Sequence, residues 1–157
     1  MGEIEDKEQA RARNAAYRLL TYRPRSRKEL EAKLREKEFT DSVIAAVIDH
    51  CTRLGYLDDA RFASQWAASR VRYRSIGKRR IEQELKQKGI DRMVIQQALL
   101  EAIPPEDERD AASKAAEKKL RTMQSLDPQV RRRRLAGFLE RKGFSPDIIR
   151  SLLNSVR

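Results

Sequence analysis

The chain has 157 residues, of which 38% are charged and 39% are hydrophobic, and its net charge is +11. The hydrophobic fraction is too high for a disordered chain, and no apolar run approaches the length of a membrane span. The one cysteine, Cys51, can form no disulfide within the chain and fits best as a small core residue. These counts favour a cytoplasmic protein without a membrane partner.

The positive charge is concentrated after residue 60. Residues 1–60 carry twelve basic and twelve acidic side chains, whereas residues 61–157 carry 23 basic and twelve acidic ones. Arginines outnumber lysines by 24 to 11, and guanidinium groups suit two-point contacts with phosphate or carboxylate. The excess indicates either a well-solvated helical surface or a polyanionic partner, which could be nucleic acid or an acidic protein face.

The first part of the chain is typical of three consecutive helices. Small and apolar residues recur at helical spacing between Ala12 and Leu20, and the segment KELEAKLREKEFTDSVIAAVI follows from Lys28. Asp41 is a candidate N-cap for the last of these helices. The apolar residues expected on one face of each of the next two helices are Leu30, Leu34, Val43, Ile44, Val47 and Ile48.

The stretch LGYLDDARFASQW, residues 54–66, could hold a catalytic carboxylate pair, a metal site or a joint between helices. Gly55 suits the left-handed residue that ends a helix, Asp58 can act as the N-cap of the next helix, and Asp59 lies in its first turn. Leu57 and Phe62 have the spacing of a hydrophobic staple, and Arg61 lies near enough in sequence to pair with Asp58. We interpret the stretch as a joint.

A catalytic or metal-binding role would need partners that the sequence lacks. Acid–base catalysis needs two carboxylates in unlike environments, and the only histidine, His50, has no companion at ligand spacing. No glycine-rich phosphate loop and no nucleophile motif occurs. We therefore expect no enzyme, no catalytic residue, no metal and no cofactor.

Residues 58–103 repeat the first pattern. The segment RRIEQELKQKGIDRMVIQQAL begins at Arg79, so that Ile81 and Leu85 correspond to Leu30 and Leu34. Trp66 lies on the apolar stripe of the upstream helix, and we interpret it as a core residue. Six cations surround the first helix joint of this unit, namely Arg70, Arg72, Arg74, Lys78, Arg79 and Arg80.

Residues 104–157 repeat the pattern again, with RRLAGFLERKGFSPDIIRSLL beginning at Arg133. Four consecutive arginines, residues 131–134, must point around a full turn of helix, because each residue advances by about 100°. Arg131 and Arg134 can share a face, while Arg132 lies nearer the core side. We therefore predict an all-α protein of three tandem three-helix repeats, residues 1–57, 58–103 and 104–157, in an elongated and curved array.

The motifs GYLDDARFA (Gly55–Ala63) and RSIGKRRIEQELKQKGI (Arg74–Ile90) resemble those of the RecX family of bacterial regulators of the RecA recombinase. In that family a proline often follows the glycine that corresponds to Gly77, and here Lys78 stands there, which adds charge and should loosen the turn. The residues that carry the resemblance are Asp58, Asp59, Arg61, Phe62, Gly77, Arg80, Ile81, Glu84, Leu85, Lys88, Gly89 and Ile90.

The resemblance implies regulation without chemistry. Members of this family lodge in the groove of the RecA filament on single-stranded DNA and restrain filament growth, strand exchange, ATP hydrolysis and co-protease activity. This implies a role in homologous recombination, DNA repair and the SOS response, with single- or double-stranded DNA as a further partner. We expect a monomer whose contact residues are Arg70, Arg72, Arg74, Lys78, Arg79, Arg80, Lys88, Arg131 and Arg134.

Some of these residues and functions have alternative interpretations. Arg80 could instead form a structural ion pair with Glu84 one turn later, and Tyr73 could either stack on a base or pack the joint. The second unit also resembles a helix-turn-helix pair, which suggests a plain nucleic-acid-binding module. Asp91 at the start of the would-be reading helix repels phosphate, so sequence-specific readout is disfavoured. An adaptor for another acidic protein is a third possibility.

Overall fold

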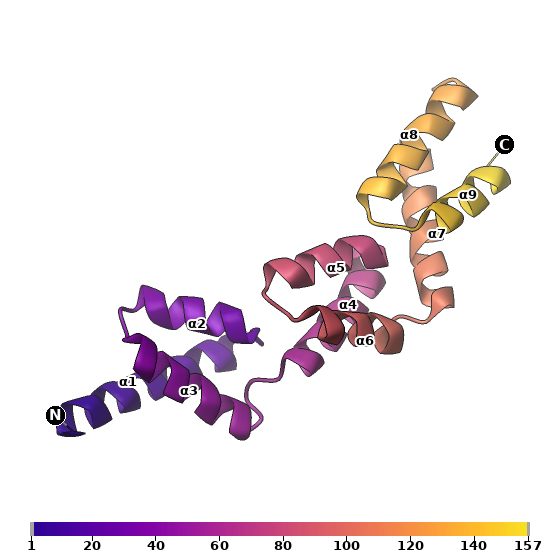
Figure 1. Ribbon diagram of the computed structural model, residues 1–157. Coiled ribbons are helices and arrows are strands. Elements are labelled where there is room, and N and C mark those ends of the chain that lie inside the picture. The colour runs from indigo at the N-terminus through magenta and orange to yellow at the C-terminus, as the bar shows by residue number, and fades with distance from the viewer. Residues whose placement is uncertain (1, 157) are drawn as a thin grey trace.

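The computed structural model describes residues 2–156, which form nine helices and no strand (Figure 1). The predicted all-α array of three-helix repeats is confirmed. None of the described helices is both long and apolar enough to cross a bilayer. The helices are α1 (Gly2–Tyr22), α2 (Arg27–Glu36), α3 (Asp41–Arg53), α4 (Asp59–Arg74), α5 (Lys78–Gln87), α6 (Arg92–Ala102), α7 (Pro105–Arg121), α8 (Pro128–Arg141) and α9 (Pro146–Ser155).

The helices form three units that follow one another in space as they do in sequence. We call α1–α3 the first unit, α4–α6 the second and α7–α9 the third. Figure 1 shows them as an elongated array with the two chain ends far apart. The second helices α2, α5 and α8 lie along the same edge of the array, toward the upper left of that view.

The helix ends follow from local sequence. The side chains of Asp91 and Ser145 cap α6 and α9 as predicted, and the left-handed residues Gly89 (φ 76°) and Gly143 (φ 88°) end the turns after α5 and α8. The prediction for Asp41 is wrong, because the N-cap of α3 is Thr40 and Asp41 is the first helical residue. Glu38 adopts the same left-handed conformation (φ 64°) that the glycines adopt in the other two units.

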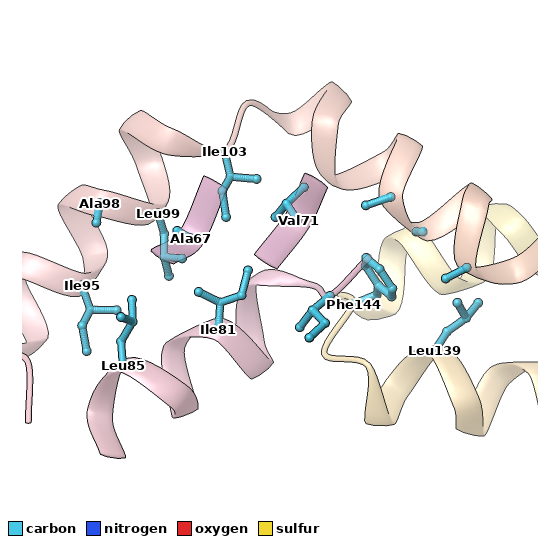
Figure 2. Packing of buried hydrophobic residues seen from close by; sticks show 14 of the residues in the cluster. Ala67, Val71, Ile81, Leu85, Ile95, Ala98, Leu99, Ile103, Leu139 and Phe144 are labelled. Atoms are coloured by element: carbon cyan, nitrogen blue, oxygen red, sulfur yellow. The ribbon is translucent and has the colours of Figure 1, made fainter. Parts of the chain in front are cut away.

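The hydrophobic core is divided unequally among the units. The first unit has its own cluster, which includes Leu30, Ile48 and the fully buried Cys51. The second and third units share one continuous cluster, in which Phe144 and Leu139 of the third unit extend the row of side chains around Ile81 (Figure 2). The hydrophobic core is therefore interrupted once, between the first and second units.

The predicted staple between Leu57 and Phe62 does not form within one core. Leu57 belongs to the cluster of the first unit, whereas Phe62 belongs to the shared cluster of the second and third units. The chain therefore changes cores between these two residues. The stretch that holds the two aspartates is the joint itself.

The first joint links α2 to the second unit through polar contacts. The backbone amide of Arg27, the first residue of α2, donates to Asp59 Oδ1 at 2.9 Å, and Ser26 Oγ donates to the carbonyl of Lys88 at 2.6 Å. Lys88 Nζ lies 2.7 Å from Glu29 Oε1. Although burial opposes it, hydrogen bonds from Lys88, Arg23 and the Ser26 amide hold the pKa of Glu29 below its ordinary value. Glu29 is thus a charged anchor at this joint.

The second joint repeats this plan with different residues. The backbone amide of Lys78, the first residue of α5, donates to Glu108 Oε1 of α7 at 2.9 Å. The amides of Gly77 and Arg79 donate to the carbonyls of Lys142 and Gly143, at 2.8 Å and 3.1 Å. In both joints, the start of a second helix meets an acid and a glycine turn of the next unit. This shared contact sets the direction in which the array grows.

The third unit lacks the free helix start that α2 and α5 use to contact the following unit. Arg132 is the residue that corresponds to Arg27 and Lys78, but α8 begins four residues earlier, at Pro128. The amide of Arg132 is therefore within the helix and not at its start. The extra turn of α8 therefore removes the helix start that forms the other two joints.

The capping role of Asp58 gives a testable prediction. Its Oδ1 accepts from the Arg61 amide at 3.0 Å, so Asp58→Ala should lower the free energy of unfolding by about 1 kcal/mol, the usual loss for an N-cap. Urea denaturation checks this value. Function per folded molecule should be unchanged, and an inactive variant of full stability would restore a direct role for this carboxylate.

Candidate interaction surface

The net positive charge is concentrated on α4, α5 and α8, and α4 has four basic residues and one acidic residue. Helix α8 has five arginines and one glutamate, and α5 has four basic and two acidic residues. The third helices are nearly neutral, since α6 and α9 each carry one basic and one acidic residue. Because α2, α5 and α8 lie on one edge of the array (Figure 1), the excess charge forms an edge that becomes more basic toward the C-terminus.

Two of the nine predicted contact residues, Arg70 and Lys88, make contacts within the protein near the first joint. The guanidinium of Arg70 and the ammonium of Lys88 each lie 4.3 Å from the centre of the Trp66 ring. Arg70 Nε is also 2.9 Å from Glu84 Oε2, and the two side chains are only 27% and 18% exposed. The Trp66 indole N–H donates to the same Oε2 at 2.9 Å. We call Trp66, Arg70, Glu84 and Lys88 the Trp66 cage.

The cage explains why a tryptophan lies at this point. Trp66 stacks on Phe62 at 5.8 Å between ring centres, and it packs against the core on that side, as predicted. Cations held against an aromatic face out of bulk water are stabilising. Through Lys88, which also binds Glu29, the cage reaches the first unit.

Arg80 is intermediate between a structural and an exposed residue. Its Nε lies 3.7 Å from Glu84 Oε1, and its side chain is 47% exposed. An exposed pair at that distance contributes little to stability. Arg80 can therefore leave Glu84 for a partner at small cost.

The remaining cations of the second unit lie around the second joint. Arg72, Arg74 and Arg79 are exposed, and Lys78 is half-buried because its backbone binds Glu108. Arg72 lines a hollow of about 390 Å³ between α4 and α7, together with Asp107 and Asp110. Burial, together with the charges of Arg80, Lys118 and Arg74, lowers the pKa of Lys142, whose Nζ donates to the carbonyl of Arg74. The region is thus strongly positive.

The turn at Lys78 is not loosened, contrary to the expectation from the missing proline. Gly77 has extended backbone (φ −81°, ψ 165°), and α5 begins at Lys78 with its amide bound to Glu108. Proline has no N–H and could not make this bond. The lysine therefore permits a contact to a carboxylate that is itself only 7% exposed.

The arginines of α8 have separate roles. Arg132 Nη1 donates to the carbonyl of Leu153 at 2.6 Å and so binds the end of α9. Arg131 is half-buried, with its amide bound to the carbonyl of Asp127, whereas Arg134 is exposed. The structure therefore does not place the two predicted residues in equivalent surroundings.

The two adjacent aspartates do not form a catalytic pair. Asp58 caps α4, while Asp59 accepts from Arg27 of the first unit, and burial raises the pKa of Asp59. The Arg61 guanidinium donates to the carbonyl of Gly55 at 2.7 Å and not to Asp58. Among the described residues, no group of three or more histidine, cysteine or acidic side chains could hold a metal ion.

The carboxylates that bind across the joints could not be identified from the sequence alone. Ser26 and Glu29 form a capping box at the start of α2, and their spacing is a readable signal for that motif. Their partner across the joint, Lys88, is about 60 residues away in sequence, and at the second joint Glu108 lies 30 residues from Lys78. The other residues that carry the resemblance are structural, since Ile81, Leu85 and Ile90 are buried in the shared core.

Comparison with known proteins gives consistent matches over nearly the whole chain. Family models for the first, second and third three-helix domains of RecX match residues 12–51, 58–99 and 106–153. The chain is 42% identical over 144 residues to the regulatory protein RecX of Mycolicibacterium vanbaalenii, covering 88% of this chain and 77% of that protein. It is 38% identical over 136 residues to the regulatory protein RecX of Thermobifida fusca, covering 87% and 73%.

A solved structure has the same fold. The crystal structure of RecX from Lactobacillus salivarius superposes with a TM-score of 0.87 and 25% sequence identity, over 96% of this chain and 97% of that one.

Proposed function

The chain belongs to the RecX family of regulatory proteins, and on this basis we propose that it binds the filament that RecA forms on DNA and restrains it. The proposed effects are slower filament growth, strand exchange, ATP hydrolysis and co-protease action, within recombinational repair and the SOS response. The acting species is a cytoplasmic monomer that carries out no chemical step.

The exposed cations around the second joint are the observation that best supports this proposal. Arg72 and Arg74, in the last turn of α4, and Arg79, in the first turn of α5, are all exposed. An elongated array can contact more than one subunit of a filament, and linked contacts strengthen one another without any new chemistry. Electrostatic attraction to an acidic filament surface also speeds the first encounter.

The direct test is DNA-dependent ATP hydrolysis by RecA at a fixed salt concentration. Increasing amounts of this protein should inhibit hydrolysis at concentrations too low to coat the DNA. Inhibition that appears only when the DNA is saturated with this protein would instead indicate competition for DNA. Full activity at every concentration would reject the proposal.

Reversing the exposed charges of the second joint should weaken inhibition. In the variant Arg72→Glu, Arg74→Glu, Arg79→Glu, three cations become anions, so an acidic filament surface repels the joint and the concentration for half-inhibition rises by about tenfold or more. The matched control is Arg11→Glu, Arg13→Glu, Arg18→Glu on α1, which makes the same change of net charge far from the joint. Circular dichroism shows whether helicity is retained. Equal weakening in both variants would mean that net charge, and not this surface, governs binding.

A nucleic-acid-binding module remains the second candidate, but the start of α6 argues against base readout. Asp91 caps that helix, with its carboxylate bound to the Met93 amide, and the exposed residues Arg92 and Met93 follow it. Of these three residues only Arg92 can donate hydrogen bonds to base edges or phosphates, and the carboxylate of Asp91 beside it repels phosphate. Equal affinity for DNA duplexes of unrelated sequence is therefore expected.

A further inference from the structure

Four cations converge on one hollow in the third unit. It lies between the end of α7, the loop that follows and the outer face of α8, and its volume is about 490 Å³. No acidic side chain of the described chain lines it. Its lining residues are Lys119, Thr122, Met123, Ser125, Leu126, Arg133, Arg134, Gly137 and Arg141.

Gly137 gives the hollow its shape. Arg134, Gly137 and Arg141 lie three and four residues apart, on one face of α8. A Cβ at Gly137 would lie 3.2 Å from Arg141 Nη1, so the missing side chain lets that guanidinium lie against the helix. The helix backbone at Gly137 therefore forms part of the floor, with Arg134 and Arg141 one turn before and after it.

Helix stability accounts for only part of this arrangement, since Lys119 and Arg141 lie in the last turns of α7 and α8. Lys119 is in the last turn of α7, where a cation is favourable with the helix dipole, and it lies 5.3 Å from the Phe138 ring. Arg133 and Arg134 lie beyond the first turn of α8, so the helix dipole does not account for them. Like charges around one hollow repel one another. A bound anion would relieve this repulsion.

We propose that this hollow binds the phosphodiester backbone of a nucleic-acid strand. Guanidinium groups donate two hydrogen bonds to one phosphate, and the hydroxyl groups of Thr122 and Ser125 can donate to the same oxygens. The apolar side chains in the lining are Met123, which is buried, and Leu126. The inference deepens the proposed function, because it assigns DNA contact to the third unit and contact with the RecA protein to the second joint. It rests on the proposed function only in taking the bound strand to be the DNA of the filament.

The test measures binding of the full-length protein to fluorescein-labelled oligothymidylate, without RecA, by fluorescence anisotropy over a range of salt. The variant Arg133→Gln, Arg134→Gln, Arg141→Gln should lose about tenfold in affinity. Its salt dependence, the slope of log K against log salt, should fall by about 2, because each phosphate contact on a single strand contributes about 0.7. The control Arg11→Gln, Arg13→Gln, Arg18→Gln should bind nearly as well as the parent. Equal losses in the two variants would overturn the site.

A second variant leaves every cation in place. Gly137 has helical backbone, so Gly137→Glu is compatible with the helix and introduces a carboxylate on the floor of the hollow. It should bind the oligonucleotide as weakly as the triple variant, whereas Gly137→Ala should retain most of the affinity. Unchanged affinity in Gly137→Glu would overturn the proposal.

Competitors distinguish the possible anions. Single-stranded and duplex DNA should both displace the labelled strand, since the shared chemistry is the phosphodiester backbone, and their ratio shows which form is preferred. Poly-glutamate that competes as well as DNA, at equal charge, would assign the hollow to an acidic protein segment and overturn the inference. Because RecA is absent, these results are independent of whether the protein inhibits ATP hydrolysis.

Discussion

Gly77→Ala is expected to separate the second unit from the third and to lower the free energy of unfolding by about 3 kcal/mol, at the upper end of overpacking losses. A Cβ at Gly77 would lie 2.4 Å from the carbonyl oxygen of Gly143 and 2.5 Å from the amide nitrogen of Phe144. Both neighbours are backbone atoms and cannot turn aside as a side chain would. The two amide–carbonyl bonds of the joint must therefore lengthen or break.

Alanine substitutions at two further glycines distinguish the effect of a steric clash from the effect of backbone strain. Gly143 has both, because its φ is 88° and a Cβ would lie 2.4 Å from the Arg80 amide nitrogen, so Gly143→Ala should be the most damaging of the three. Gly55 has a φ of 75° but nothing within 4 Å, so Gly55→Ala should lose only about 1–2 kcal/mol from strain. Urea denaturation gives the order, and small-angle scattering shows whether the joint opens. If Gly77→Ala is no more destabilising than Gly55→Ala, the close glycine contact does not hold the units together.

Glu84→Leu is expected to dismantle the Trp66 cage and to destabilise the protein by about 2 kcal/mol. The carboxylate accepts from the Trp66 indole and lies 2.9 Å from Arg70, which is only 27% exposed. Its loss leaves the indole N–H without its acceptor and Arg70 without its counter-ion. The loss is smaller than for a fully buried pair, because Arg70 can turn partly toward water.

The single tryptophan provides a direct reading of this change. Trp66 is the only tryptophan in the chain, so its fluorescence emission should shift in Glu84→Leu. The matched control is Glu82→Leu on the same helix, which removes an i,i+4 pair with the exposed Lys86 and should change stability by no more than about 0.5 kcal/mol. An unaltered emission spectrum, or equal losses in the two variants, would show that the cage does not contribute to the joint.

The elements could be predicted from the sequence because their signals are local. Apolar spacing located the buried faces, and the glycine before Ile90 and Phe144 marked the left-handed turns. The capping role of Asp58 followed from its position before an apolar stripe. Asp41 was misassigned because Thr40, one residue earlier, can begin a helix equally well.

The partners across the joints could not be predicted, because they depend on contacts between distant residues. The sequence shows Asp59 only as an acid in a first turn, but the fold brings the Arg27 amide, 32 residues earlier, onto its carboxylate. Arg70 and Lys88 look like other surface cations until α4 and α5 meet around Trp66. Tertiary packing therefore determines which cations remain available to bind a partner.

The most direct test is an electron-microscopy reconstruction of RecA filaments on single-stranded DNA with this protein bound. An elongated density should follow the filament groove, with the end of α4 at the second joint and the basic edge of α5 and α8 turned toward the filament. The same preparation made with Arg72→Glu, Arg74→Glu, Arg79→Glu should show markedly less of it. Filaments that remain bare at protein concentrations that saturate ATPase inhibition would contradict binding along the groove.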